Sequence, residues 1–142
     1  MPAHKPLAIL GAILVLGLPI AALQPAMTEE DYGKAMTEVQ RLVGDANQHV
    51  DSDYWPDLQE DLQKLRARFN AVEKFWTARE TPAAVGFAQS AIQAIKLVQA
   101  AADKEDGEAA RTALRGLQRT CQSCHAQFRE ETADGFRMRE PS

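Results

Sequence analysis

The chain has 142 residues, of which 45% are hydrophobic and 25% charged, which is typical of a single globular domain. Sixteen basic and 20 acidic residues give a net charge of −4 at pH 7. This acidic balance argues against nucleic acid as a partner and favours a basic protein surface.

The first 26 residues have the layout of a secretory signal peptide. His4 and Lys5 precede an uncharged apolar run over residues 7–23, in the order of an n-region and an h-region. The alternative is an uncleaved membrane anchor, because this run is at the short edge of what spans a bilayer. We therefore expect residues 1–26 to be a signal peptide and the rest to be an exported, periplasmic domain, in contact with the membrane only if the segment is retained.

The next segments predict two helices. Thr28 is expected to be the N-cap of the first, with Asp31 at the capping-box position, and Pro56 fits only the first turn of the second. Apolar residues recur at intervals of three and four, which predicts one buried face on each helix. These stripes are Tyr32, Met36, Val39, Val43, Ala46 and Val50 in the first helix, and Trp55, Leu58, Leu62, Leu65, Phe69, Val72 and Trp76 in the second.

Two further helices follow. Thr81 and Pro82 suit the N-cap and first position of the third, and the polar run 103–108 separates it from the fourth. Their stripes are Val85, Ala88, Ile92, Ile95, Val98 and Ala102, then Ala110, Leu114, Leu117, Cys121, Cys124 and Phe128. The sequence thus predicts an all-α, antiparallel up-down-up-down four-helix bundle over residues 27–133, with an irregular C-terminal tail over residues 134–142.

The stretch RTCQSCHAQFRE, residues 119–130, contains the only two cysteines. A redox disulfide of the thioredoxin kind would begin a helix after a strand, but this pair lies well inside a predicted helix. A structural zinc site needs four ligands, and Cys121, Cys124 and His125 supply three. Cys-x-x-Cys-His is also the attachment signal for a c-type haem, in which the thiols bind the vinyl groups and the histidine binds iron. We favour covalent haem c because it uses all three residues.

This motif near the end of an exported four-helix chain, continued as CHAQFR with Phe128 and Arg129, resembles the cytochrome c-prime family, the class II cytochromes c. The resemblance covers the whole mature chain in architecture and residues 121–129 in specific motif. It implies a four-helix bundle with one haem, His125 as the proximal iron ligand, a distal side formed by the first helix, and a homodimer through the first two helices as one arrangement. Some members leave the sixth iron position empty and bind small gases, and others fill it with methionine.

The distal side follows from bundle geometry. If the fourth helix ends near residue 132, His125 lies roughly 10 Å from that end, and Met36 lies roughly 12 Å from a first-helix start at residue 28. Since these two helix ends are neighbours in an antiparallel bundle, Met36 is expected opposite His125, as the distal iron ligand. The alternative is that Met36 is core packing and the site is vacant. His49 is roughly 20 Å beyond Met36, which argues against two histidine ligands.

Counting residues from the helix ends in the same way predicts which other residues surround the haem. It selects the late part of the second helix and the early part of the third: Phe69, Val72, Trp76, Ala88 and Ile92. Arg129 is one turn beyond His125, where a cation would favour propionate binding, although it also suits a solvated helix C-terminus.

The leading hypothesis is a periplasmic one-electron carrier that exchanges electrons with redox partner proteins, since histidine and methionine ligands suit electron transfer. The first alternative is a gas-binding cytochrome with nitric oxide or carbon monoxide as ligand. The second is a haem-bearing subunit that docks to a larger redox complex. No set of general acid, base and nucleophile is visible in the sequence, so we do not expect an enzyme.

Overall fold

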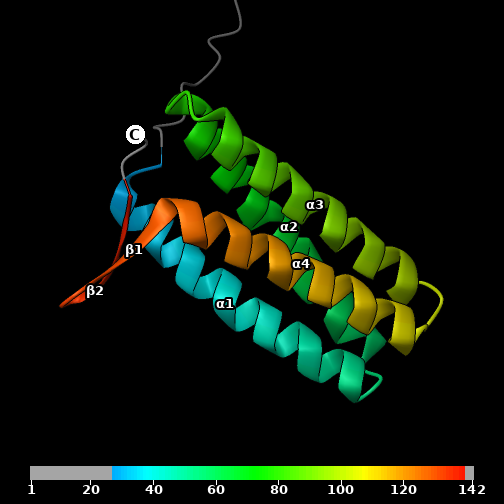
Figure 1. Cartoon of the computed structure of the whole chain (residues 1–142). Coiled ribbons are helices and arrows are strands. Elements are labelled where there is room, and N and C mark those ends of the chain that lie inside the picture. Colours follow the sequence, from blue (N-terminus) through cyan, green and yellow to red (C-terminus); the bar gives the residue numbers. More distant parts are fainter. Residues whose placement is uncertain (1–26, 140–142) are drawn as a thin grey trace, which may run out of the picture.

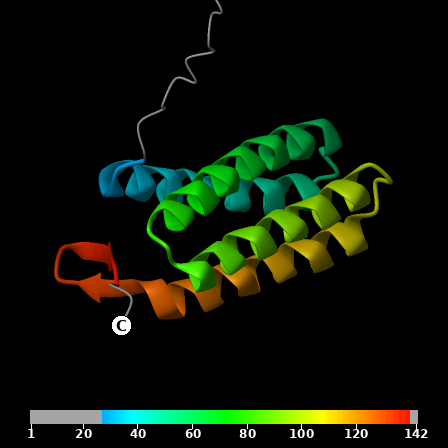
Figure 2. The ribbon, with the colours of Figure 1, turned by 90° about the horizontal axis from the view of Figure 1, so that it is seen from above.

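The computed structural model describes residues 27–139, so the predicted signal peptide lies outside the described residues. Its main elements are four helices: α1 (Glu29–Asp51), α2 (Trp55–Ala78), α3 (Pro82–Ala102) and α4 (Gly107–Phe128). Each helix packs against the next, and α4 closes the bundle against α1 (Figure 1). Seen from above, α1 and α2 lie on one side and α3 and α4 on the other (Figure 2). The predicted four-helix bundle is confirmed.

The helix starts follow local chemistry. Thr28 is the N-cap of α1: its hydroxyl accepts a hydrogen bond from the backbone N–H of Asp31 at 3.1 Å and donates one to the Asp31 carboxylate at 2.8 Å. Asp106 caps α4 in the same way, by accepting from the backbone N–H of Ala109. Thr81 occupies the N-cap position of α3 without a side-chain capping bond, and Pro82 there fits the first turn.

The interior of the bundle is apolar apart from Asp61 and Thr81. The largest side chains with almost no exposed surface are Leu42, Leu58, Leu62, Leu65, Trp76, Ile95, Leu114 and Leu117. The stripe predicted for α1 is partly wrong, because Ala35 and Leu42 are buried whereas Tyr32, Met36 and Val43 are only half-buried. In the first turns of α1, therefore, the small Ala35 side chain faces the core most directly.

The C-terminal prediction is also wrong. The fourth helix ends at Phe128, not near Ala133. An antiparallel hairpin of β1 (Arg129–Thr132) and β2 (Gly135–Met138) replaces the end of the predicted helix and the start of the predicted tail. A cross-strand ion pair joins Glu130 to Arg137. Gly135 has a φ of +133°, which only glycine adopts at low cost. The helix ends because its next residues pair with a returning strand.

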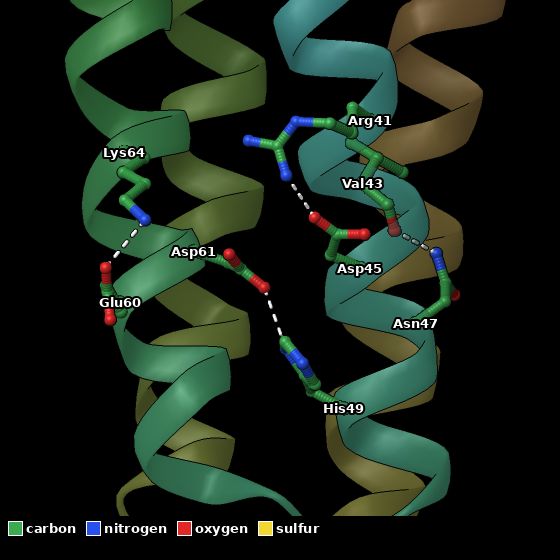
Figure 3. A network of polar contacts seen from close by, with 8 residues as sticks. All are labelled: Arg41, Val43, Asp45, Asn47, His49, Glu60, Asp61 and Lys64. Carbon is green, nitrogen blue, oxygen red and sulfur yellow. Dashed lines mark hydrogen bonds and ion pairs between the residues drawn. The ribbon is translucent and has the colours of Figure 1, made fainter.

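A polar network lies in the half of the bundle that contains the α1–α2 turn (Figure 3). His49 Nδ1 of α1 lies 2.8 Å from an Asp61 carboxylate oxygen of α2, and the Asp61 side chain is only 8% exposed. Arg41 pairs with Asp45 and Lys64 with Glu60 on the helix surfaces. His49 therefore stabilises a buried carboxylate between two helices.

None of the helices within residues 27–139 is long and apolar enough to cross a membrane.

Candidate functional site

The residues of the Cys-x-x-Cys-His motif lie in the last two turns of α4. Cys121, Cys124 and His125 are each half-buried, and at 100° per residue their side chains fall on one side of the helix. Both cysteines are free thiols. Within residues 27–139 no cluster of three metal-ligating side chains occurs that would complete a zinc site. The arrangement therefore fits two thiols and one imidazole directed at a single group.

Burial keeps both thiols neutral in the absence of a covalent partner. Desolvation raises the pKa of Cys121, and it raises the pKa of Cys124 to about 11, with a smaller contribution from Cys121. Thiols with high pKa values are poor nucleophiles at neutral pH. This speaks against a reactive redox pair and suits cysteines that serve as an attachment.

The His125 imidazole is held in its neutral form. Burial lowers its pKa, and the nearby positive charge of Arg129 lowers it further. Neutral imidazole is the form that binds a metal ion. Among the described residues, no side chain or backbone group forms a hydrogen bond with its ring nitrogens, in contrast to His49. The ring nitrogens of His125 are therefore available to bind a metal ion.

An aromatic cluster closes this end of the bundle beyond the motif. It consists of Tyr32 of α1, Phe75 and Trp76 of α2, Phe87 of α3 and Phe128 of α4. The ring centroids of Tyr32 and Phe75 are 4.4 Å apart, and those of Trp76 and Phe128 are 5.3 Å apart. The Trp76 indole donates a hydrogen bond to the Tyr32 hydroxyl at 3.2 Å. All four helices therefore contribute to one apolar wall.

The cluster relates the level of Met36 to that of His125. Tyr32 and Phe128 both contact Trp76, so they lie near one height in the bundle. Met36 is four residues further into the bundle than Tyr32, or roughly 6 Å, and His125 is three residues further in than Phe128, or roughly 4.5 Å. Met36 is half-buried and packs against the core. Both predicted iron ligands thus lie just inside the aromatic cluster, on the adjacent helices α1 and α4.

The residues predicted to surround the haem are all in the core: Phe69, Val72, Trp76, Ala88 and Ile92 are each less than 9% exposed. Trp76 contacts Phe128, the residue three positions after His125. Ile92 also lines a polar groove of about 510 Å³ between α2 and α3. A role of these residues against the porphyrin stays a prediction.

Arg129 follows Phe128 directly and is exposed. Its guanidinium carbon lies 3.9 Å from the ring centroid of Phe136 in the hairpin, which is a cation–π contact. Arg129 is close enough to His125 to lower the pKa of the imidazole. Its predicted contact with a propionate stays a prediction.

Sequence reasoning missed two parts of this end of the bundle. Phe87 and Phe128 have ring centroids 6.4 Å apart, but Phe87 is absent from the predicted α3 stripe. The hairpin returns Met138 to the core and Arg139 to Phe128, whose carbonyl accepts a hydrogen bond from the Arg139 backbone N–H at 2.9 Å. The Asp134-Gly135 pair is a common turn signal and could have indicated this hairpin from the sequence.

Comparison with known proteins supports the chemistry of this site. The family model described as "Cytochrome C'" matches residues 20–129 of the chain, and this range includes the Cys-x-x-Cys-His motif. No curated protein and no solved structure matches the chain. The free, half-buried thiols and the neutral imidazole fit the covalent haem c that this family binds. The chain belongs to the cytochrome c′ family and carries haem c.

Proposed function

We propose that this protein is a periplasmic one-electron carrier. Cys121 and Cys124 attach the haem through thioether bonds, His125 is the proximal ligand and Met36 the distal ligand. The single observation that carries the proposal is that Met36 and His125 lie at similar depths on the adjacent helices α1 and α4, just inside the aromatic cluster.

Haem c, when bound, supplies an iron that alternates between the ferrous and ferric states. The side chains around the haem keep the structural change that accompanies electron transfer small. Met36 and His125 remain in place on two rigid helices, so few atoms move when an electron arrives or leaves. Tyr32, Trp76 and Phe128 exclude water from one side of the site. A ligand that fills the sixth iron position also prevents substrate binding, which agrees with a carrier rather than an enzyme.

One observation favours a gas-binding function instead. At the level of Met36, the α1 residue that is buried against the core is Ala35, at 5% exposure, whereas Met36 is half-buried. An alanine occupies less space beside the proposed haem than a larger side chain would. In this second candidate function, Met36 packs beside the haem and the open position binds nitric oxide or carbon monoxide.

Carbon monoxide binding separates the two functions. For a carrier, the ferrous protein is expected to resist carbon monoxide at concentrations that saturate the Met36→Ala variant, because the thioether must first be displaced. If the unmodified ferrous protein binds carbon monoxide as tightly as the variant does, Met36 does not occupy the position and the gas-binding function is correct.

A further inference from the structure

Charges are divided unequally between the two sides of the bundle. The helical residues of α1 and α2, 29–51 and 55–78, contain ten acidic and six basic residues. The helical residues of α3 and α4, 82–102 and 107–128, contain one acidic and four basic residues. Because α1 and α2 lie opposite α3 and α4 (Figure 2), an acidic protein has one basic side.

The basic residues of α4 follow its exposed surface. Arg111, Arg115 and Arg119 are spaced by four residues, and no acid occurs between Glu108 and Glu130. Arg111 pairs with Asp51 of α1 at 2.8 Å. Among the described residues, Arg115 and Arg119 form no ion pair, and Arg115 only donates a hydrogen bond to the Thr112 hydroxyl. Two guanidinium groups are thus exposed on the helix that carries the haem motif.

These two arginines lie close to the motif. Arg119 is roughly 3 Å and Arg115 roughly 9 Å from Cys121 along the helix axis. At 100° per residue their side chains point about 120° (Arg115) and 160° (Arg119) around the helix from Cys121, so both lie on the outer side of α4. The outer faces of α1 and α2 are at least one interhelical spacing further away, about 8–10 Å.

Some of the acidic residues at the same end of the bundle are neutralised by ion pairs. Three of them are in ion pairs: Glu29 with Arg79, Glu30 with Lys34 and Glu130 with Arg137. Residues 129–139 of the hairpin segment contain three basic and three acidic residues. The potential on the outer face of α4 is therefore set mainly by Arg115 and Arg119.

We propose that the exposed face of α3 and α4 around Arg115 and Arg119 is the docking face for a redox partner with an acidic surface. This inference rests on the proposed function as an electron carrier. Opposite charges steer proteins into encounter and raise the association rate. This docking proposal reverses the expectation from the net charge of the chain alone, which favours a partner with a basic surface.

Two small oxidants of opposite charge test the local potential. Hexacyanoferrate(III) accepts one electron from the ferrous protein and becomes hexacyanoferrate(II), and the protein becomes ferric. The rate is expected to fall as ionic strength rises from about 0.01 M to about 0.5 M, since screening weakens attraction. Cationic tris(phenanthroline)cobalt(III) should show a smaller or opposite salt dependence. A rate with hexacyanoferrate(III) that rises with salt would contradict the inference.

A matched pair of variants separates local from net charge. Arg115→Gln/Arg119→Gln should slow the reaction with hexacyanoferrate(III) at low salt roughly threefold or more. Lys64→Gln/Lys104→Gln removes the same charge in the half of the bundle away from the motif, and should change the rate by roughly less than twofold. Equal effects of the two double variants would show that net charge alone decides the rate.

A footprint identifies the docking face without electron transfer. Poly-L-glutamate added to the ferrous protein should shift backbone amide signals in α3 and α4, and these shifts should disappear in Arg115→Gln/Arg119→Gln. Shifts confined to α1 and α2 would overturn the docking proposal. If neither oxidant reacts with the protein, the electron-carrier function fails, and the footprint still decides which face binds an acidic surface.

Discussion

The Trp76 indole donates a hydrogen bond to the hydroxyl of Tyr32 at 3.2 Å, which joins α2 to α1 just beyond the haem motif. The rings of both residues also meet edge to face, with centroids 5.8 Å apart. Desolvation raises the pKa of Tyr32 to about 12, although the hydrogen bond from Trp76 opposes the shift. The neutral phenol is therefore part of the folded structure.

This raised pKa predicts a loss of stability at alkaline pH. A tyrosine ionises near pH 10 in the unfolded chain. Because the pKa of Tyr32 is higher in the folded protein, the contribution of this residue to the free energy of unfolding is fully present below pH 10. About 2–3 kcal/mol of this free energy is lost as the pH rises toward 12. Urea unfolding of Tyr32→Phe should lose correspondingly less stability over this range, and the exposed Tyr54→Phe should behave like the unmodified protein. If Tyr32→Phe lost as much stability between pH 10 and 12 as the unmodified protein, ionisation of Tyr32 would not be the cause of the loss.

Attachment of the haem through the two thiols has a chemical test. In the unmodified protein, acid-acetone extraction should leave the haem on the polypeptide. Cys121→Ala/Cys124→Ala should release all of it, because no thiol remains to form a thioether bond. Release of haem from the unmodified protein, or retention by the double variant, would exclude Cys121 and Cys124 as the attachment sites.

The His49–Asp61 pair predicts a stability effect without a haem effect. His49→Leu leaves the buried Asp61 carboxylate without its partner and should cost about 3–5 kcal/mol in urea unfolding. His49→Leu/Asp61→Leu should recover most of this loss. Arg41→Gln, which breaks an exposed ion pair on the same helix, should cost less than about 1 kcal/mol. The ferric spectrum should be unchanged in His49→Leu, and a changed spectrum would mean that His49 is near the iron.

Two glycines should respond to alanine in opposite directions. Gly44 is within α1 and has open space around its Cα, so Gly44→Ala should stabilise the protein by roughly 0.5–1 kcal/mol. Gly135 has a φ of +133° in the hairpin, so Gly135→Ala should destabilise the β1–β2 pairing by roughly 1 kcal/mol or more. Hydrogen exchange at the hairpin amides measures the second effect. Unchanged protection there would mean that the turn tolerates a side chain.

The helices were predictable from the sequence because their signals are local. The Thr28 cap and the spacing of apolar residues locate α1 to within its first turn. The end of α4 was not predictable in this way, because Arg129 continues a helical pattern that stops only where β2 pairs with β1. Phe87 was missed for the same reason, since its contact with Phe128 depends on how α3 packs against α4. Contacts between distant segments decided both features.

Within the site, the sequence motif identified Cys121, Cys124 and His125 because their spacing is itself the chemical requirement. The depth of Met36 rested on estimated helix ends, and the end of α4 was wrong by several residues. The aromatic cluster gives a better reference, because it relates α1 and α4 through contacts rather than through their ends. Whether the Met36 thioether reaches the iron depends on side-chain packing around a bound haem, which spacing does not determine.

The ferric absorption spectrum of Met36→Ala tests the central proposal most directly. The unmodified protein should show a low-spin spectrum with a methionine–iron charge-transfer band, and Met36→Ala should lose that band. Met27→Ala and Met138→Ala are matched controls, since both methionines are also partly buried against the core, and they should keep it. A high-spin, five-coordinate spectrum that is the same with and without Met36 would contradict the assignment of Met36 as the distal ligand.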